Sequence, residues 1–175
     1  NKHITTLGLV MEVAGELDIP IIVLDRPNPI RGDIIEGPVL KLEYQSSFGY
    51  YPISIRYGGT IGDLAKLIIE QNWINEVPVL TVIPTEGWNN HLWFDETDLR
   101  YISSSDMPNL QTEIVYPGMC LIEGSNVSEG RGTHKPFQWI GAPWINGQNL
   151  SKELNKFNLP GVVFAPISFT PKSIS

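Results

Sequence analysis

Two glutamates, Glu123 and Glu129, lie in one glycine-rich loop that spans residues 123–133. A pair of carboxyl groups is what hydrolysis of a glycosidic bond requires, one as general acid and the other as base or nucleophile. Asn126 and Ser128 add uncharged polar groups to the same loop. We therefore predict Glu123 and Glu129 as catalytic residues, and Asn126 and Ser128 as residues that bind substrate.

Arg131 brings a cation into this loop. Its planar guanidinium is suited to bidentate recognition of a carboxylate, and the glycines on either side of it resemble the backbone of an anion-binding nest. The alternative is an ion pair of Arg131 with Glu123 or Glu129 that only braces the loop. Residue types leave both interpretations open, and Arg131 is kept as a predicted substrate-binding residue.

A second polar cluster, Asp25, Arg26 and Asn28, follows an apolar run at residues 21–24, and its two prolines exclude both helix and central strand. Ligands of open parallel sheets bind beyond the carboxyl ends of the strands, so we predict that these three residues contact substrate. A rigid turn, in which Asp25 pairs with Arg26 or caps nearby N–H groups, is an equal alternative. Trp93, in a long loop at 84–108, is predicted to bind substrate because aromatic rings stack on sugars. An equal alternative is that the ring fills the join between two domains.

Composition argues against several classes of function. The net charge of −7 disfavours nucleic acid as a partner, since duplex binding depends on Lys and Arg that neutralise phosphates. No apolar run approaches the ~18 residues of a membrane-spanning helix. The three histidines are scattered and there is one cysteine, so we predict no metal site and no internal disulfide. No Gly-x-Gly-x-x-Gly follows residues 21–24, and therefore no cofactor is expected.

The elements that must position these residues alternate between helix and strand. Residues 4–17 have apolar side chains at helical spacing, whereas 21–24 and 77–83 are apolar runs typical of strands buried on both faces. Residues 51–57 are expected to be partly extended, and Thr60 and Asp63 have the spacing of a capping box at the start of a second helix. This order predicts an α/β layered fold with a mostly parallel sheet.

The later part of the chain has weaker periodicity. We expect a helix over 110–116 that breaks at Pro117-Gly118, a short helix over 150–157 and a strand over 162–164. The chain has no initiator Met and opens directly into a helical pattern, which suggests a fragment or a processed form.

The order of the loops resembles that of the NamZ-type exo-β-N-acetylmuramidases, a bacterial family. The segments that carry the resemblance are VLDRPNP at 23–29, EGP at 36–38, GTIGDL at 59–64, WFD at 93–95, VYPG at 115–118, EGSNVSEGRGT at 123–133, IGAPW at 140–144 and FAPISFTP at 164–171. Each segment is weakly specific by itself. Together, in this order, they span nearly the whole chain.

The resemblance implies a Rossmann-like domain followed by a smaller C-terminal domain, with the active site in the cleft between them. On this basis residues 1–135 are expected to be the C-terminal part of the first domain, and 136–175 the beginning of the second. A family segment with a Glu-His pair, thought to carry a catalytic glutamate, lies upstream of the region of resemblance. The resemblance also implies export, to the periplasm or the outside of the cell.

Two hypotheses on function follow from the resemblance. The first is a glycosidase, or a large piece of one, that releases N-acetylmuramic acid from the non-reducing end of peptidoglycan fragments, so that the partner is a peptidoglycan-derived saccharide. The second is a catalytically silent module that binds the same sugars. In both, Arg131 is expected to pair with the lactyl carboxylate of N-acetylmuramic acid, and Glu129 to orient the guanidinium or to serve in acid–base work.

Overall fold

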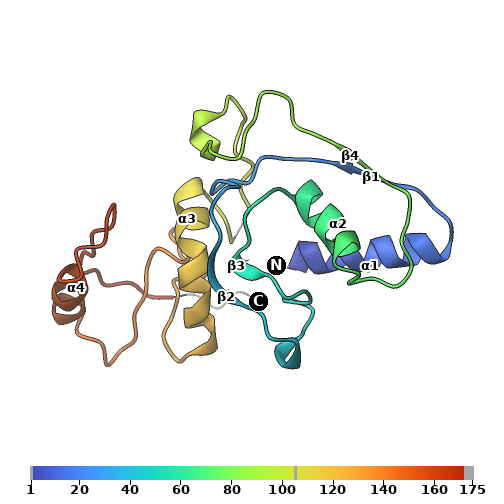
Figure 1. Ribbon diagram of the computed structural model, residues 1–175. Helices are drawn as coiled ribbons and strands as arrows, with labels where there is room; N and C mark the ends of the chain where they lie inside the picture. The colour runs from blue at the N-terminus through green and yellow to red at the C-terminus, as the bar shows by residue number, and fades with distance from the viewer. Residues whose placement is uncertain (1, 105, 172–175) are drawn as a thin grey trace. The chain divides into compact units, whose positions relative to one another are not determined.

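Strands β1 (Ile21–Leu24) and β4 (Leu80–Ile83) pair in parallel, from Ile21 opposite Leu80 to Leu24 opposite Ile83. They belong to the first of two units into which the chain divides, Asn1–Arg100 and Tyr101–Ser175. The computed structural model describes residues 2–104 and 106–171 (Figure 1). The α/β prediction with a parallel pair is confirmed. The predicted domain boundary at 135/136 stays a prediction.

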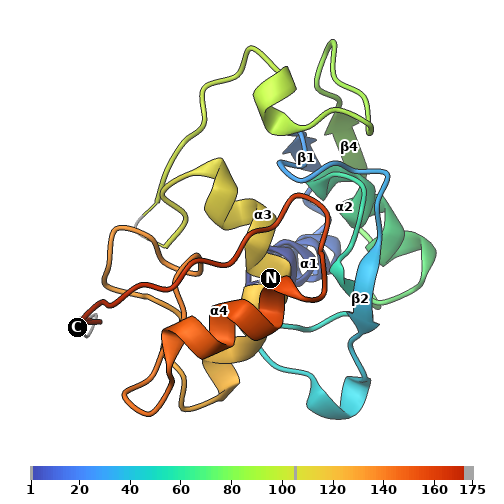
Figure 2. The same cartoon turned by 90° about the vertical axis from the view of Figure 1, so that its left-hand side faces the viewer.

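Two helices lie on one side of this strand pair (Figures 1 and 2). Helix α2 (Ile61–Glu70) packs against both strands and against α1 (Lys2–Glu16). The core of the unit combines apolar side chains of all three elements: Ile4 and Met11 from α1, Val23 from β1, and Leu64, Ala65 and Ile68 from α2. The helical spacing at 4–17 thus predicted α1 correctly, apart from its last residue.

The predicted capping box begins α2. The Thr60 side chain accepts a hydrogen bond from the Asp63 backbone N–H at 3.1 Å, and the Asp63 carboxylate accepts one from the Thr60 N–H at 3.0 Å. These two bonds satisfy N–H groups that the first helical turn leaves unpaired. The helix therefore starts at a residue that the sequence specifies.

An antiparallel pair, β2 (Glu36–Val39) and β3 (Ser54–Arg56), completes the strands of the described residues. β3 lies within the segment expected to be extended. At β2 the sequence predicts a loop instead, because Gly37 and Pro38 are typical of loops. The pairing is irregular between Glu36 and Val39, and Gly37 has φ of 83°, which glycine adopts without strain. A short helical turn, η1 (Leu42–Tyr44), lies between β2 and β3, and another, η2 (Phe94–Glu96), follows β4.

Helix α3 (Leu110–Met119) opens the regular structure of the second unit and continues into a 3₁₀ turn, η3 (Cys120–Gly124). The predicted break at Pro117-Gly118 is wrong, because Pro117 lies inside the helix. A proline in the last turn removes only one backbone hydrogen bond, and the Cys120 N–H still donates to the Tyr116 and Gly118 carbonyls. Asn109 caps the other end by accepting from the Thr112 N–H at 3.0 Å.

Helix α4 spans Gly147–Asn155, somewhat earlier than the predicted range of 150–157. The strand predicted over residues 162–164 does not form. The Asn155 side chain takes the place of a neighbouring strand: its amide donates to the Phe164 carbonyl at 2.8 Å and accepts from the Phe164 N–H at 2.9 Å. With these backbone groups satisfied locally, and Val163 87% exposed, nothing holds the segment as a strand.

Candidate functional site

Asp25 lies at the carboxyl end of β1, as predicted, and its side chain binds the beginning of α2. One carboxylate oxygen accepts from the Thr60 hydroxyl at 2.6 Å, and the other from the backbone N–H groups of Gly62 at 2.9 Å and Arg26 at 3.0 Å. A carboxylate in this position is favoured by the partial positive charge of a helix N-terminus. These contacts match the alternative in which Asp25 caps nearby N–H groups, and a substrate contact stays a prediction.

Asn28 and Arg26 differ in their surroundings. Asn28 is 6% exposed, donates to the Gly59 carbonyl at 2.8 Å and accepts from the Ile30 N–H at 3.1 Å. It ties the loop after β1 to the turn before α2. Arg26 is less buried, so of these two side chains Arg26 is the one that a ligand reaches without displacing a buried contact.

Trp93 has two guanidiniums close to its ring. The Cζ atoms of Arg31 and Arg56 lie 5.9 Å and 5.7 Å from the ring centroid, within the range of cation–π attraction. Arg56 also pairs with Glu36 at 2.7 Å and donates to the Ile30 carbonyl. The indole thus joins the loop after β4 to the loop after β1, and the stacking of a sugar on Trp93 stays a prediction.

Sequence reasoning missed an ionic cluster in the same pair of loops. Arg31 donates to Asp33 through Nε at 3.0 Å and Nη2 at 2.7 Å, and the His91 Nδ1 atom lies 2.9 Å from the same carboxylate. The hydrogen bond from Arg31 is the main reason that the pKa of Asp33 lies well below its usual range, and His91 adds to the effect. Arg31 and Asp33 are two residues apart, whereas His91 is distant in sequence and joins them because its loop follows β4, which pairs with β1.

In the second unit, Arg131 lies between the two predicted catalytic glutamates. Its Nη2 atom donates to Glu123 at 3.0 Å, and its Nε atom lies 3.6 Å from Glu129. Among the described residues no hydrogen bond reaches Nε, which is buried, although the whole side chain is 39% exposed. The structure therefore brings Glu123, Glu129 and Arg131 together, and the ion pairs are those of the bracing alternative.

The backbone around Arg131 turns on two glycines. Gly130 and Gly132 have φ of 79° and 73°, a left-handed conformation that other residues rarely adopt. A Cβ atom at Gly130 would lie 2.8 Å from the Trp139 carbonyl oxygen. Ser128 and Gly141 exchange two backbone hydrogen bonds, of 2.9 Å and 3.0 Å, so the two ends of the segment 128–141 lie side by side.

Two aromatic residues that sequence reasoning did not select surround this cluster. The Phe137 ring has the Arg131 Cζ atom 5.2 Å from its centroid, and the Tyr116 ring meets it edge-on at 4.8 Å. Burial, followed by the charge of Glu123, raises the pKa of Tyr116. Tyr116 belongs to a segment that carried the family resemblance and Phe137 lies close to two others, but aromatic residues in such segments are more often core than site.

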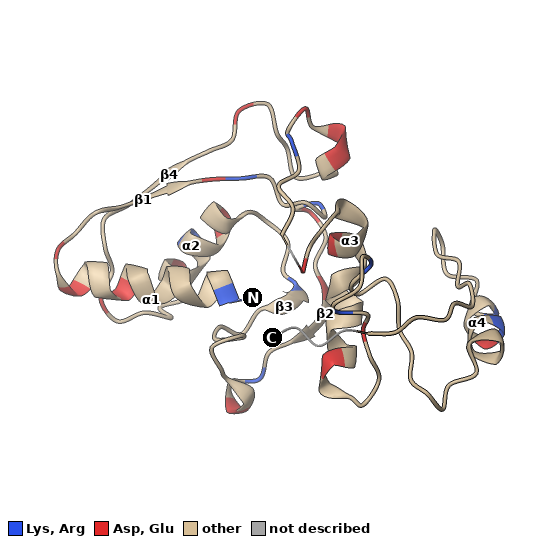
Figure 3. Ribbon diagram, turned by 180° about the vertical axis from the view of Figure 1, so that it is seen from behind, with Lys and Arg blue, Asp and Glu red and all other residues tan. Residues whose placement is uncertain are grey.

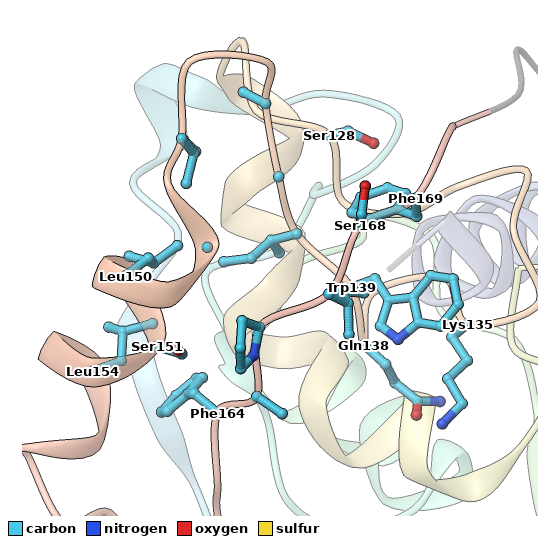
Figure 4. A pocket seen from close by; sticks show the side chains of 18 of the residues that line it. Ser128, Lys135, Gln138, Trp139, Leu150, Ser151, Leu154, Phe164, Ser168 and Phe169 are labelled. Carbon is cyan, nitrogen blue, oxygen red and sulfur yellow. The ribbon is translucent and has the colours of Figure 1, made fainter.

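Asn126 and Ser128 line a separate cavity of about 770 Å³ in the second unit. Its wall also includes Lys135, Gln138, Trp139 and Phe169, with residues of α4 opposite (Figure 4). Glu123, Glu129 and Arg131 are not among its lining residues. The predicted substrate-binding residues of this loop therefore divide between the cavity and the ionic cluster.

Residues 2–104 and 106–171 contain neither a metal-binding cluster nor a membrane-spanning helix. No group of three or more His, Cys, Asp and Glu side chains in this part of the chain is arranged to hold a metal ion. Over the same residues, no helix combines the length and the apolar character needed to cross a membrane.

The family model for the N-terminal domain of the exo-β-N-acetylmuramidase NamZ matches residues 2–113, and the model for its C-terminal domain matches residues 114–175. The peptidoglycan β-N-acetylmuramidase NamZ of Bacillus subtilis strain 168 is 48% identical over 170 residues. This match covers 97% of the chain and 41% of the Bacillus protein.

Two solved structures from Bacteroides fragilis are similar, both of proteins described as members of the DUF1343 family. One, at 1.65 Å resolution, has a TM-score of 0.90 and 36% identity over 97% of this chain and 45% of its own. The other, at 1.30 Å, has a TM-score of 0.76 and 36% identity over 82% and 40%. The chain spans less than half the length of each relative. Because the two NamZ models together cover residues 2–175, the chain belongs to the NamZ exo-β-N-acetylmuramidase family.

Proposed function

We propose that this chain forms part of the substrate-binding surface of a glycosidase that releases N-acetylmuramic acid from the non-reducing end of peptidoglycan fragments. The family supports this proposal, as does the name of the Bacillus relative, of which the chain spans 41%. The observation that carries it in the structure is the arrangement of Arg131 between Glu123 and Glu129.

The substrate sugar carries a charge that distinguishes it. N-acetylmuramic acid differs from N-acetylglucosamine by a lactyl ether, whose carboxylate is ionised at neutral pH. The protein has a net charge of −7, and the ribbon in Figure 3 shows acidic residues on α1 and around η2. A substrate anion therefore needs a local cation that offsets the general repulsion.

Arg131 has the free hydrogen-bonding capacity that this role requires. Glu123 occupies its Nη2 atom at 3.0 Å, and no hydrogen bond to Nη1 occurs within the described residues. The edge formed by Nη1 and the second Nη2 hydrogen is the one that binds carboxylates end-on. Glu123 and Glu129 fix the guanidinium from its other side, so that little rotamer freedom is lost when the ligand binds.

The same ion pairs favour a second candidate function for the isolated chain, a saccharide-binding module without catalysis. The general acid of a glycosidase must present its carboxyl group to the glycosidic oxygen. Both predicted catalytic glutamates instead contact Arg131. These contacts suit them to orienting the guanidinium, and their catalytic assignment stays a prediction.

The proposal is tested with Arg131→Ala in the complete gene product, assayed on a chromogenic β-N-acetylmuramide and on the matching β-N-acetylglucosaminide. A charge-assisted hydrogen bond is worth about 1.5–3 kcal/mol, so kcat/KM for the muramide should fall by roughly 10- to 100-fold. The rate on the glucosaminide and the melting temperature should change little. The kcat/KM of Arg131→Lys on the muramide should lie between the values of the wild-type protein and Arg131→Ala, since lysine keeps the charge but loses the planar fork.

Two outcomes decide between the alternatives. A variant that melts earlier but keeps its preference for the muramide would show that Arg131 only braces the loop. Turnover by the complete gene product, together with saturable binding but no turnover by residues 1–175, would assign the second candidate function to this chain.

We also propose that the protein acts outside the cytoplasmic membrane. The support is the location of peptidoglycan itself, together with the name of the Bacillus relative. Cell fractionation with an antibody against this chain tests the proposal, which fails if the protein is recovered only in the cytosol.

A further inference from the structure

Phe137 combines deep burial with a backbone conformation that aromatic residues avoid. It is 1% exposed, with φ of 61°, and its N–H donates to the Glu129 carbonyl at 2.7 Å. A bulky residue in the left-handed region is an outlier with an energetic cost. Strain of this kind persists only where the surrounding structure enforces it.

Both neighbours of Phe137 are bonded to the start of α3. The Thr112 hydroxyl, fully buried, lies 3.3 Å from the Pro136 carbonyl oxygen, to which it donates. The Gln138 side chain donates to Asn109 at 3.0 Å and to Thr112 at 2.8 Å. The two residues that flank Phe137 are therefore fixed, and so is the direction of its ring.

That ring faces the guanidinium of Arg131. The Arg131 Cζ atom lies 5.2 Å from the Phe137 centroid, and the Tyr116 ring packs edge-on against Phe137 with an interplanar angle of 87°. A guanidinium near the face of an aromatic ring is attracted by the negative face of the π-system, more strongly where water is excluded. The two glutamates contact the guanidinium through its nitrogens, and the Phe137 ring packs close to its central carbon.

We propose that Phe137 is a positioning residue for substrate specificity: its strained, α3-anchored ring orients Arg131 toward the carboxylate of the muramyl sugar. This inference rests on the proposed function of Arg131. It predicts that Phe137 acts only through Arg131, which separates it from an ordinary core residue.

The test measures the ratio of kcat/KM on the muramide to kcat/KM on the glucosaminide in the complete gene product. Phe137→Leu should lower this ratio about two- to tenfold, the size of a cation–π contribution. The lower kcat/KM on the muramide should come from a higher KM at unchanged kcat, because a contact remote from the reacting bond exists in both the ground state and the transition state. Tyr51→Leu, which removes another buried aromatic ring, is the control and should leave the ratio unchanged.

A double-mutant cycle separates this inference from the proposed function. In an Arg131→Ala background, Phe137→Leu should have no further effect on the ratio. If Arg131→Ala itself leaves the ratio unchanged, the proposed function fails. If Arg131→Ala lowers the ratio while Phe137→Leu does not, or if the two effects simply add, only the role of Phe137 is overturned.

A second variant, Phe137→trifluorophenylalanine, tests the proposal if Phe137→Leu does not fold. Fluorination nearly preserves the shape of the ring but weakens its negative face. The muramide preference should fall with fluorination at an unchanged melting temperature. An unchanged preference would show that Phe137 contributes packing alone.

Discussion

Gly8 illustrates how a single residue limits the packing of the first unit. A Cβ atom at this position of α1 would lie 1.8 Å from the Tyr51 hydroxyl oxygen and 2.5 Å from its Cζ atom. Tyr51 is 4% exposed and stacks on Trp73 at 5.4 Å. Burial raises the pKa of Tyr51 to about 12. Moving the ring to make room for a side chain would break its stacking on Trp73 and expose a buried aromatic surface.

We expect Gly8→Ala to destabilise the protein by about 1–3 kcal/mol, the usual cost of overpacking a core, although alanine is the better helix former. Urea denaturation measures this difference. Gly118→Ala is the matched control in α3, because no atom of a packing partner among the described residues lies within 4 Å of the place where its Cβ would stand. This change should be neutral or slightly stabilising, and equal effects at the two sites would contradict the steric argument.

Residue types predicted that Arg131 pairs with a glutamate of its loop, but they did not predict its aromatic neighbours. The sequence left an Arg131 pair with Glu123 or with Glu129 open, and the structure has both. It did not indicate Phe137 or Tyr116, because a single aromatic residue in a loop or a helix is consistent with core packing. Their role depends on φ at Phe137 and on the approach of α3, neither of which a local pattern encodes.

At the scale of elements, the Asp25 carboxylate links the end of β1 to the start of α2. It accepts from the Thr60 hydroxyl and from the Gly62 N–H, 2.6 Å and 2.9 Å away. Asp25→Ala should lower the free energy of unfolding by about 1–3 kcal/mol, because it leaves these donors without their charged acceptor. Arg26→Ala, at the next residue, removes an exposed side chain for which the described residues provide no comparable contact, and it should leave stability unchanged.

Urea denaturation and steady-state kinetics, measured on the same Asp25 and Arg26 variants, separate bracing from binding. A higher KM for Arg26→Ala at full stability would support the predicted substrate contact of Arg26. Loss of activity in Asp25→Ala with no loss of stability would instead place Asp25 against the substrate.

The loops after β1 and β4 should be linked in a pH-dependent way. Because the folded pKa of Asp33 lies below the unfolded value of about 3.9, the unfolded state binds more protons as the pH falls through this range. The stabilisation is therefore fully present above about pH 5 and is lost progressively at lower pH. The stability gap between the wild-type protein and Asp33→Asn should be constant from about pH 5 to 7 and shrink below about pH 4.

Urea titrations across this pH range, from strongly acidic to neutral, measure the gap. Asp98→Asn, which removes an exposed carboxylate from the same part of the chain, is the control for the loss of one negative charge. A gap for Asp33→Asn that widens on acidification would reverse the sign of the linkage and contradict the depressed pKa.

Elements with strong local signals were predicted, and those that depend on distant partners were not. Apolar runs indicated β1 and β4, and Thr60 with Asp63 indicated the start of α2. The expected burial of both strands on both faces is wrong, because Ile22 and Leu24 of β1 and Ile83 of β4 are exposed. β2 was missed because Gly37 and Pro38 are typical of loops, and it forms only where β3 supplies a partner. The expected strand over 162–164 failed for the opposite reason, since the Asn155 side chain binds both backbone groups of Phe164 in place of a partner strand.

At the scale of the whole molecule, the two units are joined by a stretch without helix or strand over residues 97–104 and 106–109. Arg100 lies in it and is exposed, with Leu99 49% exposed and Ile102 71% exposed beside it. Exposed chain of this kind is where proteases cut first. We expect brief trypsin treatment to cut after Arg100 before it cuts the helices.

Mass spectrometry of the first fragments tests this expectation. Arg100→Gln should delay the first cut without a change in melting temperature, because only the recognition site is removed. Earlier cuts within α1 or α2 would contradict the division of the chain into these units.

The hydrogen bonds between Ser128 and Gly141 make the segment between them suitable for synthesis as a cyclic peptide. Because each residue donates to the other, at 2.9 Å and 3.0 Å, the chain leaves and returns at a single point. A synthetic macrocycle closed at that point would retain the turn at Gly130 and the bond from Phe137 to Glu129, and would lack the support of α3 and of Glu123. The proposed receptor for an anionic sugar is thus carried largely on a piece of polypeptide that is nearly a ring.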